Sequence, residues 1–223
     1  MKRLLLFLFT HRFLAIARWE IHFLLLRTRN ALTGQRARIA KAMKGRGPLY
    51  LNLGSGPRGL DDGRWVNVDG FVDRNVHFTL DFGRPLPFAD KAFAGAFCEH
   101  VLEHFEIEDG EAIAREVCRV LEPGGRFRVI VPDAELVMRR YFDEPQAIAD
   151  YRESRSPIEG VNSFFRQRYE HQFLYDWPGM RDMLLRAGFS EVLRKGFKQG
   201  DVEAILLDHP KYEWESLYVE AVR

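Results

Sequence analysis

The sequence predicts one α/β domain built on a mostly parallel β-sheet, with an amphipathic helix in front of it. Strand-like and helix-like stretches alternate from residue 49 onward, which is typical of such a sheet. Polar or acidic residues follow four successive strand-like runs, at the edge where parallel sheets bind ligands. A chain of 223 residues, 46% of them hydrophobic, is long enough for one such domain and short for two.

The expected elements follow from apolar runs and the breakers between them. A helix is expected at residues 109–121, because Ile113, Val117 and Val120 recur at helical spacing and the Pro-Gly-Gly of residues 123–125 ends it. A second helix is expected at 179–187, closed by Gly188. Strands are expected at residues 49–53, 65–68, 76–80, 93–98, 127–131, 192–197 and 216–222.

The first 46 residues, the basic arm, differ in charge from the rest of the chain. They contain eleven basic residues and a single acidic one, Glu20, so they carry a net charge of +10 and leave −9 for the remainder. Breaker residues at 44–48 predict a linker between this arm (1–46) and a domain that spans residues 47–223.

The arm is expected to be an amphipathic helix. On a helical projection His11, Arg18, His22 and Arg29 form one stripe, and most other positions are apolar. The longest apolar run, residues 4–9, is far shorter than the roughly 20 residues of a membrane-spanning helix. Two alternatives remain: the arm lies on an anionic membrane surface, or it packs on the domain or on a second subunit.

Cysteine usage indicates the compartment. Cys98 and Cys118 are too few for a disulfide framework and suit a reducing environment. Both fall in apolar runs and are expected to be small buried residues. Together with the arm, this predicts a protein of the cytoplasm or of the inner face of the membrane.

A glycine-rich loop follows the first strand. Residues 54–59 read G-S-G-P-R-G, which has the spacing of a dinucleotide-binding loop. Such a loop requires a helix that receives a pyrophosphate on its N-terminus, and residues 57–63 have no apolar periodicity for one. Asp69 ends the second strand, where a carboxylate can accept both hydroxyls of a ribose. The pattern favours a nucleoside without a pyrophosphate over a dinucleotide.

A histidine motif follows the fourth strand. His100, Glu103 and His104 have the H-x-x-E-H spacing of the inverted zinc-protease signature. A catalytic zinc needs a third ligand, and no neighbouring residue has the spacing of one, although His171 and Asp133 could serve. We expect His100 to face the ligand cleft and His104 to close the cleft through a hydrogen bond. No metal is assigned to the motif from the sequence.

Four stretches stand in order between residues 49 and 133: L-N-L-G-S-G at 51–56, V-D at 68–69, the stretch at Asp81 with P-L-P-F at 85–88, and L-E-P-G-G-R-F at 121–127. With them, this part of the chain resembles the class I S-adenosylmethionine-dependent methyltransferases, in particular their type 11-like group. The most specific part is the stretch of residues 85–93 followed by C-E-H-V-L-E-H and then by L-E-P-G-G. Overall the pattern is similar to uncharacterised bacterial members that accompany surface-glycan assembly.

The resemblance implies a doubly wound, Rossmann-like sheet whose last strand, residues 216–222, inserts antiparallel. It also implies S-adenosylmethionine as the cofactor. The residues expected to bind it are Asn52, Gly54, Ser55 and Gly56 at the methionine part, Asp69 and Gly70 at the ribose, Asp81 and Phe82 at the adenine, and Cys98, Glu99 and His104 beside the methyl donor.

The chain departs from the family pattern at two points. Asn52 stands where the family usually has Asp or Glu, which weakens pairing with the ammonium group of the cofactor. The connections after the first two strands are too short for full crossover helices, although parallel pairing normally needs a crossover of a dozen or more residues.

Methyl transfer from a sulfonium is an in-line displacement, so catalysis rests largely on holding two partners in line. With a hydroxyl acceptor, a base must take its proton near the transition state, and an imidazole suits neutral pH. His100 is the predicted base, with Asp133 and His171 as alternatives. Glu103 could orient an imidazole, although a helix carboxylate that faces solvent is the more common arrangement.

Residues 134–177 are expected to form a substrate lid, because they are rich in arginines and aromatic residues. These suit a sugar ring with a nearby phosphate or carboxylate, and equally a lid packed on the sheet with solvated arginines. Nucleic acid is not an expected partner, because the domain is acidic.

The predicted function is an S-adenosylmethionine-dependent methyltransferase that methylates oxygen on a glycan, a lipid-linked molecule or another small-molecule acceptor. One alternative is a membrane-recruited nucleoside-binding module of the same fold without turnover. The other is a nicotinamide-dinucleotide-binding protein.

Overall fold

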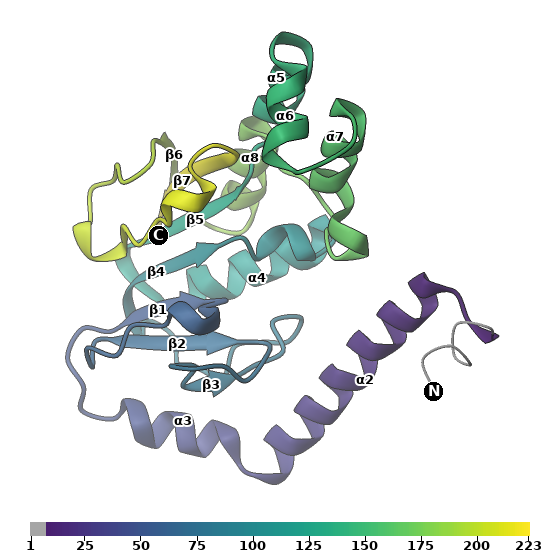
Figure 1. Cartoon of the computed structure of the whole chain (residues 1–223). Coiled ribbons are helices and arrows are strands. Elements are labelled where there is room, and N and C mark those ends of the chain that lie inside the picture. Colours follow the sequence, from purple (N-terminus) through teal and green to yellow (C-terminus); the bar gives the residue numbers. More distant parts are fainter. Residues whose placement is uncertain (1–7) are drawn as a thin grey trace.

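A computed structural model describes residues 8–223 and shows a seven-stranded sheet with helices on one face and at one end (Figure 1). The strand order is β3-β2-β1-β4-β5-β7-β6. The strands are β1 (Tyr50–Leu53), β2 (Trp65–Asp69), β3 (Phe78–Thr79), β4 (Phe93–Glu99), β5 (Leu121–Pro132), β6 (Glu191–Lys195) and β7 (Ser216–Val222).

The pairing confirms the predicted sheet. Strands β3, β2, β1, β4 and β5 pair in parallel, and β7 runs antiparallel to both β5 and β6. The run predicted at 76–80 contributes only Phe78 and Thr79, because this edge strand pairs with β2 only at Val68 and Asp69. The fifth strand is longer than predicted, since Leu121 already pairs with Phe93 ahead of a register shift.

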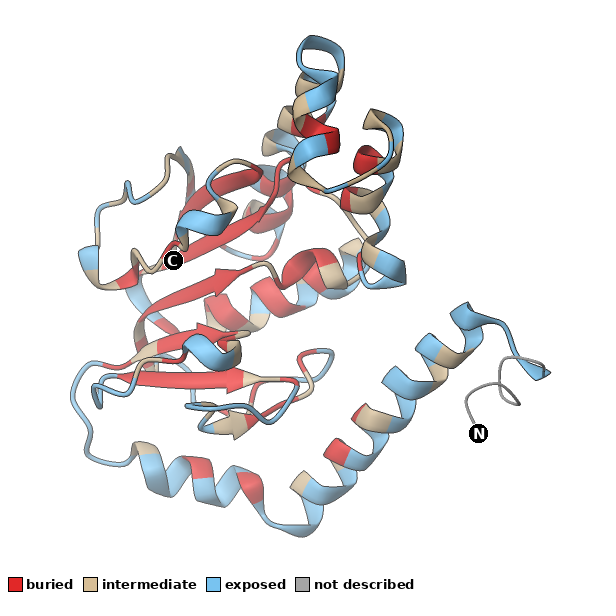
Figure 2. Cartoon of the chain, in the orientation of Figure 1, coloured by how far each residue is buried: buried red, intermediate tan, exposed pale blue. Residues whose placement is uncertain are grey.

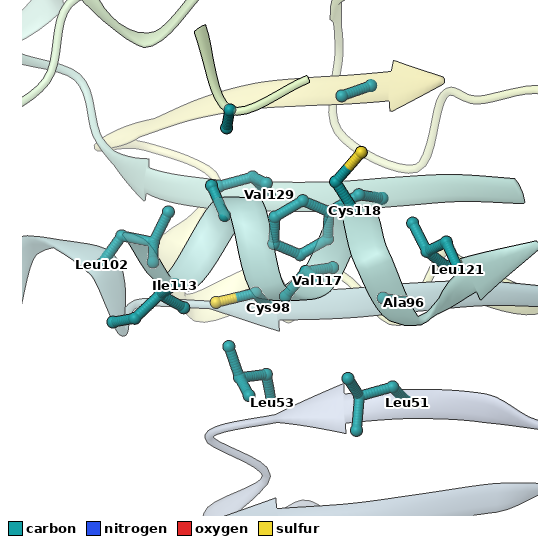
Figure 3. Packing of buried hydrophobic residues seen from close by; sticks show 14 of the residues in the cluster. Leu51, Leu53, Ala96, Cys98, Leu102, Ile113, Val117, Cys118, Leu121 and Val129 are labelled. Atoms are coloured by element: carbon teal, nitrogen blue, oxygen red, sulfur yellow. The ribbon is translucent and has the colours of Figure 1, made fainter. Parts of the chain in front are cut away.

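Helices of the domain cover one face of the sheet. On that face α4 (Ile107–Val120) and α8 (Trp177–Arg186) pack against the strands. Leu51 and Leu53 point toward α4, and Ile113 and Val117 of the helix meet them in one buried cluster (Figure 3). Cys98 and Cys118 are buried in the same cluster, and burial raises the pKa of both thiols.

Loops cover the other face. Residues 54–64, which connect β1 to β2, contain only a short 3₁₀ turn, η1 (Gly56–Arg58). The β6–β7 connection, residues 196–215, lies over this face and includes the short turns η4 (Glu203–Ile205) and η5 (Pro210–Tyr212). It packs Ile205 against Trp65 and Phe97 of the sheet. The long C-terminal connection thus covers the face that the short early connections leave without a helix.

A buried ion pair attaches this connection to the sheet. Arg128 of β5 and Asp208 are both fully buried, and their side chains form a two-bonded pair. Arg128 also donates to the carbonyl oxygens of Gly196 and Gln199, at 2.8 Å each. Asp208 accepts a further hydrogen bond from the backbone of Lys198, at 2.7 Å. Because Gly196, Gln199 and Asp208 of the connection all bond to one guanidinium, its path over the sheet is fixed.

The described part of the basic arm, residues 8–46, contains the helices α2 (His11–Leu32) and α3 (Gln35–Met43), and most of the apolar run at residues 4–9 lies outside the described residues. The second half of α2 packs on the domain: Phe23 and Leu26 are buried, and Arg27 pairs with Asp81 at 2.8 Å. His22 and Arg29 of the predicted stripe also contact the domain, at Gly70 and Thr79. Of the two alternatives for the arm, packing on the domain is therefore what this half of α2 shows.

The first half of α2 extends away from the sheet and is largely exposed (Figures 1 and 2). Apolar side chains are exposed along α2: Phe13 in the first half is 51% exposed, and Ile21 and Leu25, on the face turned away from the domain, are 57% and 64% exposed. Within residues 8–223, no helix combines the length and apolar character needed to cross a membrane.

Three helices form a separate layer at the end of the sheet: α5 (Ala134–Asp143), α6 (Pro145–Tyr151) and α7 (Pro157–Arg166), followed by the turn η3 (Gln167–Tyr169). Their shared core contains Val137, Ile148 and Phe164, against which Trp214 packs. Arg140 lies over the Trp214 ring at 4.0 Å and Arg152 over Phe164 at 4.4 Å. Two of the arginines in this stretch therefore pack within the layer.

We expect Arg128→Met to lower the free energy of unfolding by about 3–5 kcal/mol, because it leaves the Asp208 carboxylate buried and unpaired. Arg139→Met is the matched control: Arg139 is 72% exposed in its pair with Glu135, so its loss should cost no more than about 1 kcal/mol. Urea denaturation followed by circular dichroism measures both. Equal midpoints for the two variants would show that the buried pair does not hold the connection.

Candidate cofactor and catalytic site

The carboxyl ends of β1, β2 and β4 meet at one edge of the sheet, and the glycine loop lies there against β4. Gly54 has a φ of +74°, and a Cβ at this position would collide with the side chain of Val101. Only glycine allows both this backbone conformation and this close approach. The loop is therefore pressed against the turn that carries His100.

Asp69 ends β2 and holds two loops through its carboxylate. Its Oδ2 accepts from the backbone of Gly56 and its Oδ1 from the backbone of Phe71, both at 2.9 Å. Each carboxylate oxygen can accept a further hydrogen bond, so both could still receive a ribose hydroxyl. The predicted ribose residue thus lies beside the predicted methionine loop.

A small cavity of about 30 Å³ lies at the end of β1 and β4. Among its lining residues, Asn52 donates to Asn67 at 3.3 Å. Ser55 has a buried hydroxyl that forms no hydrogen bond within residues 8–223. A cavity of this size holds about one water molecule, so the loop must open to admit anything larger.

Glu99 and Arg58 close this cavity with opposite charges. Their side chains form an ion pair at 3.0 Å, in which Glu99 is 3% and Arg58 is 42% exposed. The other oxygen of Glu99 accepts from the backbone of His209 at 2.8 Å, and Arg58 lies over the ring of Tyr212 at 5.5 Å. The buried carboxylate is fixed, whereas its arginine partner reaches it from the surface.

The predicted adenine border is in contact with the arm. Asp81 accepts from the backbone of Gly83 at 3.0 Å and pairs with Arg27 of α2. The carbonyl of Gly70 lies 2.8 Å from His22 Nε2, and a Cβ on Gly70 would be 3.0 Å from the ring of Phe23. Phe82 is buried in the main core. Helix α2 therefore flanks the ribose and adenine side of the edge.

His100 follows β4 and is held on three sides. Its Nδ1 lies 3.1 Å from Oε1 of Glu103, its Nε2 lies 3.0 Å from the hydroxyl of Ser216, and its ring stacks on Tyr212 at 4.0 Å. The residue has a φ of +54°, an uncommon backbone conformation for a histidine. Its side chain is 12% exposed. The imidazole is thus fixed between a buried carboxylate and a hydroxyl.

Asp133 has a different environment from that of His100. It caps α5 by accepting from the backbone of Leu136, and it pairs with Arg194 at 3.0 Å. Burial raises the pKa of its carboxyl. With one oxygen capping a helix and the other in an ion pair, Asp133 is bound to structural partners.

His171, the other alternative base, lies beside His104. The two rings are 5.0 Å apart and nearly perpendicular. Nδ1 of His104 lies 3.1 Å from the carbonyl oxygen of Glu170. Glu103 and His104 belong to the short turn η2 (Leu102–His104), and both lie close to His171. Burial lowers the pKa of His171.

The site contains residues that sequence reasoning did not select. Arg58 carried a signal, since it is the one charged side chain in the G-S-G-P-R-G stretch of residues 54–59. Ser216 and Tyr212 carried none, because they lie more than 100 residues from His100 in the chain and reach it only through the β6–β7 connection.

Comparison with known proteins gives one family match. Residues 68–129 match the family model described as a methyltransferase domain. No curated protein gives a significant match.

Solved structures with a similar fold include a Burkholderia thailandensis 1,6-didemethyltoxoflavin-N1-methyltransferase with bound 1,6-didemethyltoxoflavin and S-adenosylhomocysteine. It is 17% identical, has a TM-score of 0.50, and the match covers 96% of this chain and 89% of that one. A SAM-dependent methyltransferase from Archaeoglobus fulgidus is 13% identical with a TM-score of 0.48, over 87% and 94% of the two chains. The family match covers residues 68–129, and the Burkholderia thailandensis structure shares the fold of this chain.

Proposed function

We propose that this chain is an S-adenosylmethionine-dependent methyltransferase that transfers the methyl group to a hydroxyl oxygen of a glycan, a lipid-linked molecule or another small-molecule acceptor. The observation that supports an oxygen acceptor is the environment of His100. Its imidazole is held by the buried carboxylate of Glu103 and already makes a hydrogen bond of 3.0 Å to a hydroxyl, that of Ser216. An acceptor hydroxyl in the place of Ser216 would meet the same nitrogen.

The nucleoside half of the cofactor would bind between Asp69 and Asp81. Each carboxylate oxygen of Asp69 can accept one more hydrogen bond, from a ribose hydroxyl. Gly70 beside it has no side chain to occupy the space next to the ribose, and its nearest neighbour is Phe23 of α2. The Asp81–Phe82 pair, with Arg27 behind it, would border the adenine. Because the ribose and adenine side is flanked by the arm, α2 would form one wall of this part of the site.

The methionine half carries an ammonium and a carboxylate, and the Arg58–Glu99 pair offers the matching charges. Glu99 would pair with the ammonium and so replace the acidic residue that the family has at the position of Asn52. Arg58, which is 42% exposed, would turn from Glu99 to the carboxylate of the cofactor. Ser55, whose buried hydroxyl forms no hydrogen bond within the described chain, lines the same cavity and could donate to that carboxylate. Opening of the Arg58–Glu99 pair is thus the movement that would admit the cofactor.

In the reaction the acceptor oxygen forms a bond to the methyl carbon as the bond from that carbon to sulfur breaks. The sulfur leaves as a neutral thioether, and the proton of the acceptor hydroxyl passes to His100. Glu103 is a positioning residue: its carboxylate holds Nδ1, so that Nε2 faces the hydroxyl. The remaining contribution is the alignment of oxygen, carbon and sulfur by the closed site.

The acceptor would lie under the layer of α5, α6 and α7. Arg140 and Arg152 pack inside this layer, so they are not available to an acceptor without rearrangement. The aromatic side chains of Phe142 and Tyr169 are 78% and 50% exposed and could stack on a sugar ring. The exposed Arg139 could pair with a phosphate or a carboxylate.

We also propose that the exposed face of α2 rests on an anionic membrane surface. Its polar stripe is used against the domain at His22 and Arg29, and the apolar side chains of Ile21, Leu24 and Leu25 face outward. The arm as a whole has a net charge of +10, which would draw it to anionic lipids. An apolar face flanked by basic residues is typical of helices that lie in a membrane interface.

Cofactor binding is tested by calorimetric titration of S-adenosylmethionine into the wild type, Asp69→Ala and Arg58→Gln. Loss of the Asp69 carboxylate should weaken binding by about 1.5–3 kcal/mol, because two charge-assisted hydrogen bonds disappear. Arg58→Gln should also weaken binding, since no positive charge then meets the methionine carboxylate. Undiminished affinity in Asp69→Ala would refute the ribose assignment, and tight binding of a nicotinamide dinucleotide instead would support that alternative.

The base is tested with His100→Gln and methyl-labelled cofactor, using a detergent-solubilised bacterial envelope extract as the source of acceptor. We expect cofactor affinity to stay within a few-fold, whereas methyl incorporation falls roughly 10²–10⁴-fold, the usual contribution of a positioned base. His11→Gln, on the exposed half of α2, is the matched control. If His100→Gln incorporated methyl groups at the wild-type rate, the base would have to be another residue. Wild-type protein that binds cofactor without any incorporation would favour the module without turnover.

Membrane binding is tested by sedimentation with anionic vesicles of phosphatidylcholine and phosphatidylserine. The double variant Leu24→Glu, Leu25→Glu should lose most of its binding, because it places two charges on the outward face and leaves the contacts of Phe23 and Leu26 intact. Phe142→Glu, at an apolar residue of α5 that is even more exposed than Leu24 and Leu25, should bind like the wild type. Binding should also weaken with added salt. Equal sedimentation of both variants would contradict the proposal.

A further inference from the structure

The H-x-x-E-H motif gains a third partner from a distant part of the chain. One ligand atom each of Glu103, His104 and His171 lies in a single group, and no two of these atoms are more than 4.8 Å apart. The segment after η3 is held there by its backbone, since Gln172 and Phe173 both donate to the carbonyl of Glu103, at 2.8 and 3.2 Å. The fold thus supplies the ligand that no residue near the motif could provide.

The carboxylate of Glu103 lacks the partners that a buried charge needs. The residue is fully buried, and neither of its oxygens has a hydrogen bond within residues 8–223. His100 Nδ1 forms an ion-pair contact of 3.1 Å with Oε1, and Oε2 has no such contact within the described residues. A fully buried carboxylate whose one such contact is a histidine, charged only when protonated, keeps much of its desolvation cost. A cation beside it would remove most of that cost.

The two histidines are oriented as metal ligands usually are. His104 Nδ1 lies 3.1 Å from the carbonyl oxygen of Glu170, and His171 Nδ1 lies 2.6 Å from that of Phe164. A carbonyl oxygen can only accept, so each Nδ1 carries the hydrogen and each Nε2 presents a lone pair. A backbone carbonyl that fixes the tautomer in this way is the common outer partner of a metal-bound histidine.

We propose that Glu103, His104 and His171 form a mononuclear site for a divalent first-row transition metal of the zinc type. Two imidazole nitrogens and one carboxylate oxygen suit such an ion, whereas magnesium and calcium prefer sites made of oxygen ligands. Zinc bonds of about 2.0–2.2 Å place ligand atoms roughly 3.5 Å apart, so binding would draw the widest pair together by about 1 Å. Three protein ligands leave a coordination position for water or for an oxygen of the acceptor.

The site is tested on the whole protein after treatment with a chelator and its removal. Calorimetric titration with zinc chloride should show one ion per chain, and cobalt(II) should give the visible absorption of a low-coordinate site. Glu103→Gln, which keeps the volume of the side chain, and His104→Gln, whose ring is only half-buried, should each bind zinc at least about 100-fold more weakly. His11→Gln, exposed on α2, should bind like the wild type.

Two results would overturn the proposal. The first is a wild-type protein that binds no zinc at micromolar concentration. The second is equal zinc affinity in the wild type, Glu103→Gln, His104→Gln and His171→Ala. Circular dichroism of each variant separates loss of a ligand from loss of the fold, and His104→Gln decides the matter if a core variant does not fold. None of these measurements requires methyl transfer, so they stand whether or not the acceptor is an oxygen.

Discussion

The Arg128–Asp208 ion pair determines where the β6–β7 connection runs, and the site depends on that path. One guanidinium, buried in the middle of the sheet, bonds to Gly196, Gln199 and Asp208. From Asp208 the chain continues directly to His209, whose backbone bonds to Glu99. A few residues later come Tyr212, which stacks on His100, and Ser216, which bonds to it. The face that lacks crossover helices is therefore also the face from which the site is completed.

Two buried carboxylates near the carboxyl end of β4, those of Glu99 and Glu103, differ in their partners and therefore in the ligands that they suit. Glu99 has an arginine partner that can leave, so its charge would be free to meet an ammonium when Arg58 turns away. Glu103 has only a neighbouring histidine at 3.1 Å and two further histidines close by. The first arrangement suits a ligand that carries both charges. The second suits either a positioned imidazole or a cation, and a single carboxylate can serve both, because it has two oxygens.

The sheet could be predicted from the sequence because its signals are local. Apolar runs placed the strands, the Pro-Gly-Gly after residue 122 ended α4, and the final strand inserts antiparallel as the resemblance implied. The cover of the second face could not be predicted, since it depends on Arg128 and Asp208, which are 80 residues apart and resemble any other charged pair in the sequence. His171 was named from the sequence as a residue that could serve as a third ligand, but its position beside Glu103 could not be predicted for the same reason. Spacing rules detect ligands on one helix, not ligands brought together by backbone bonds of a distant segment.

The arm shows how one helix can present opposite faces to two surroundings. A stripe of polar residues in an apolar helix suggests that the apolar side is buried and the stripe exposed. Here His22 and Arg29 bond to the domain instead, because the edge at Gly70, Thr79 and Asp81 offers carbonyl, hydroxyl and carboxylate acceptors. The consequence is that Ile21, Leu24 and Leu25 point outward, although the exposure of apolar side chains to water is unfavourable. Since α2 also flanks the predicted adenine side, a surface that receives this apolar face would lie close to the cofactor, and a lipid-linked acceptor would reach the site from that surface.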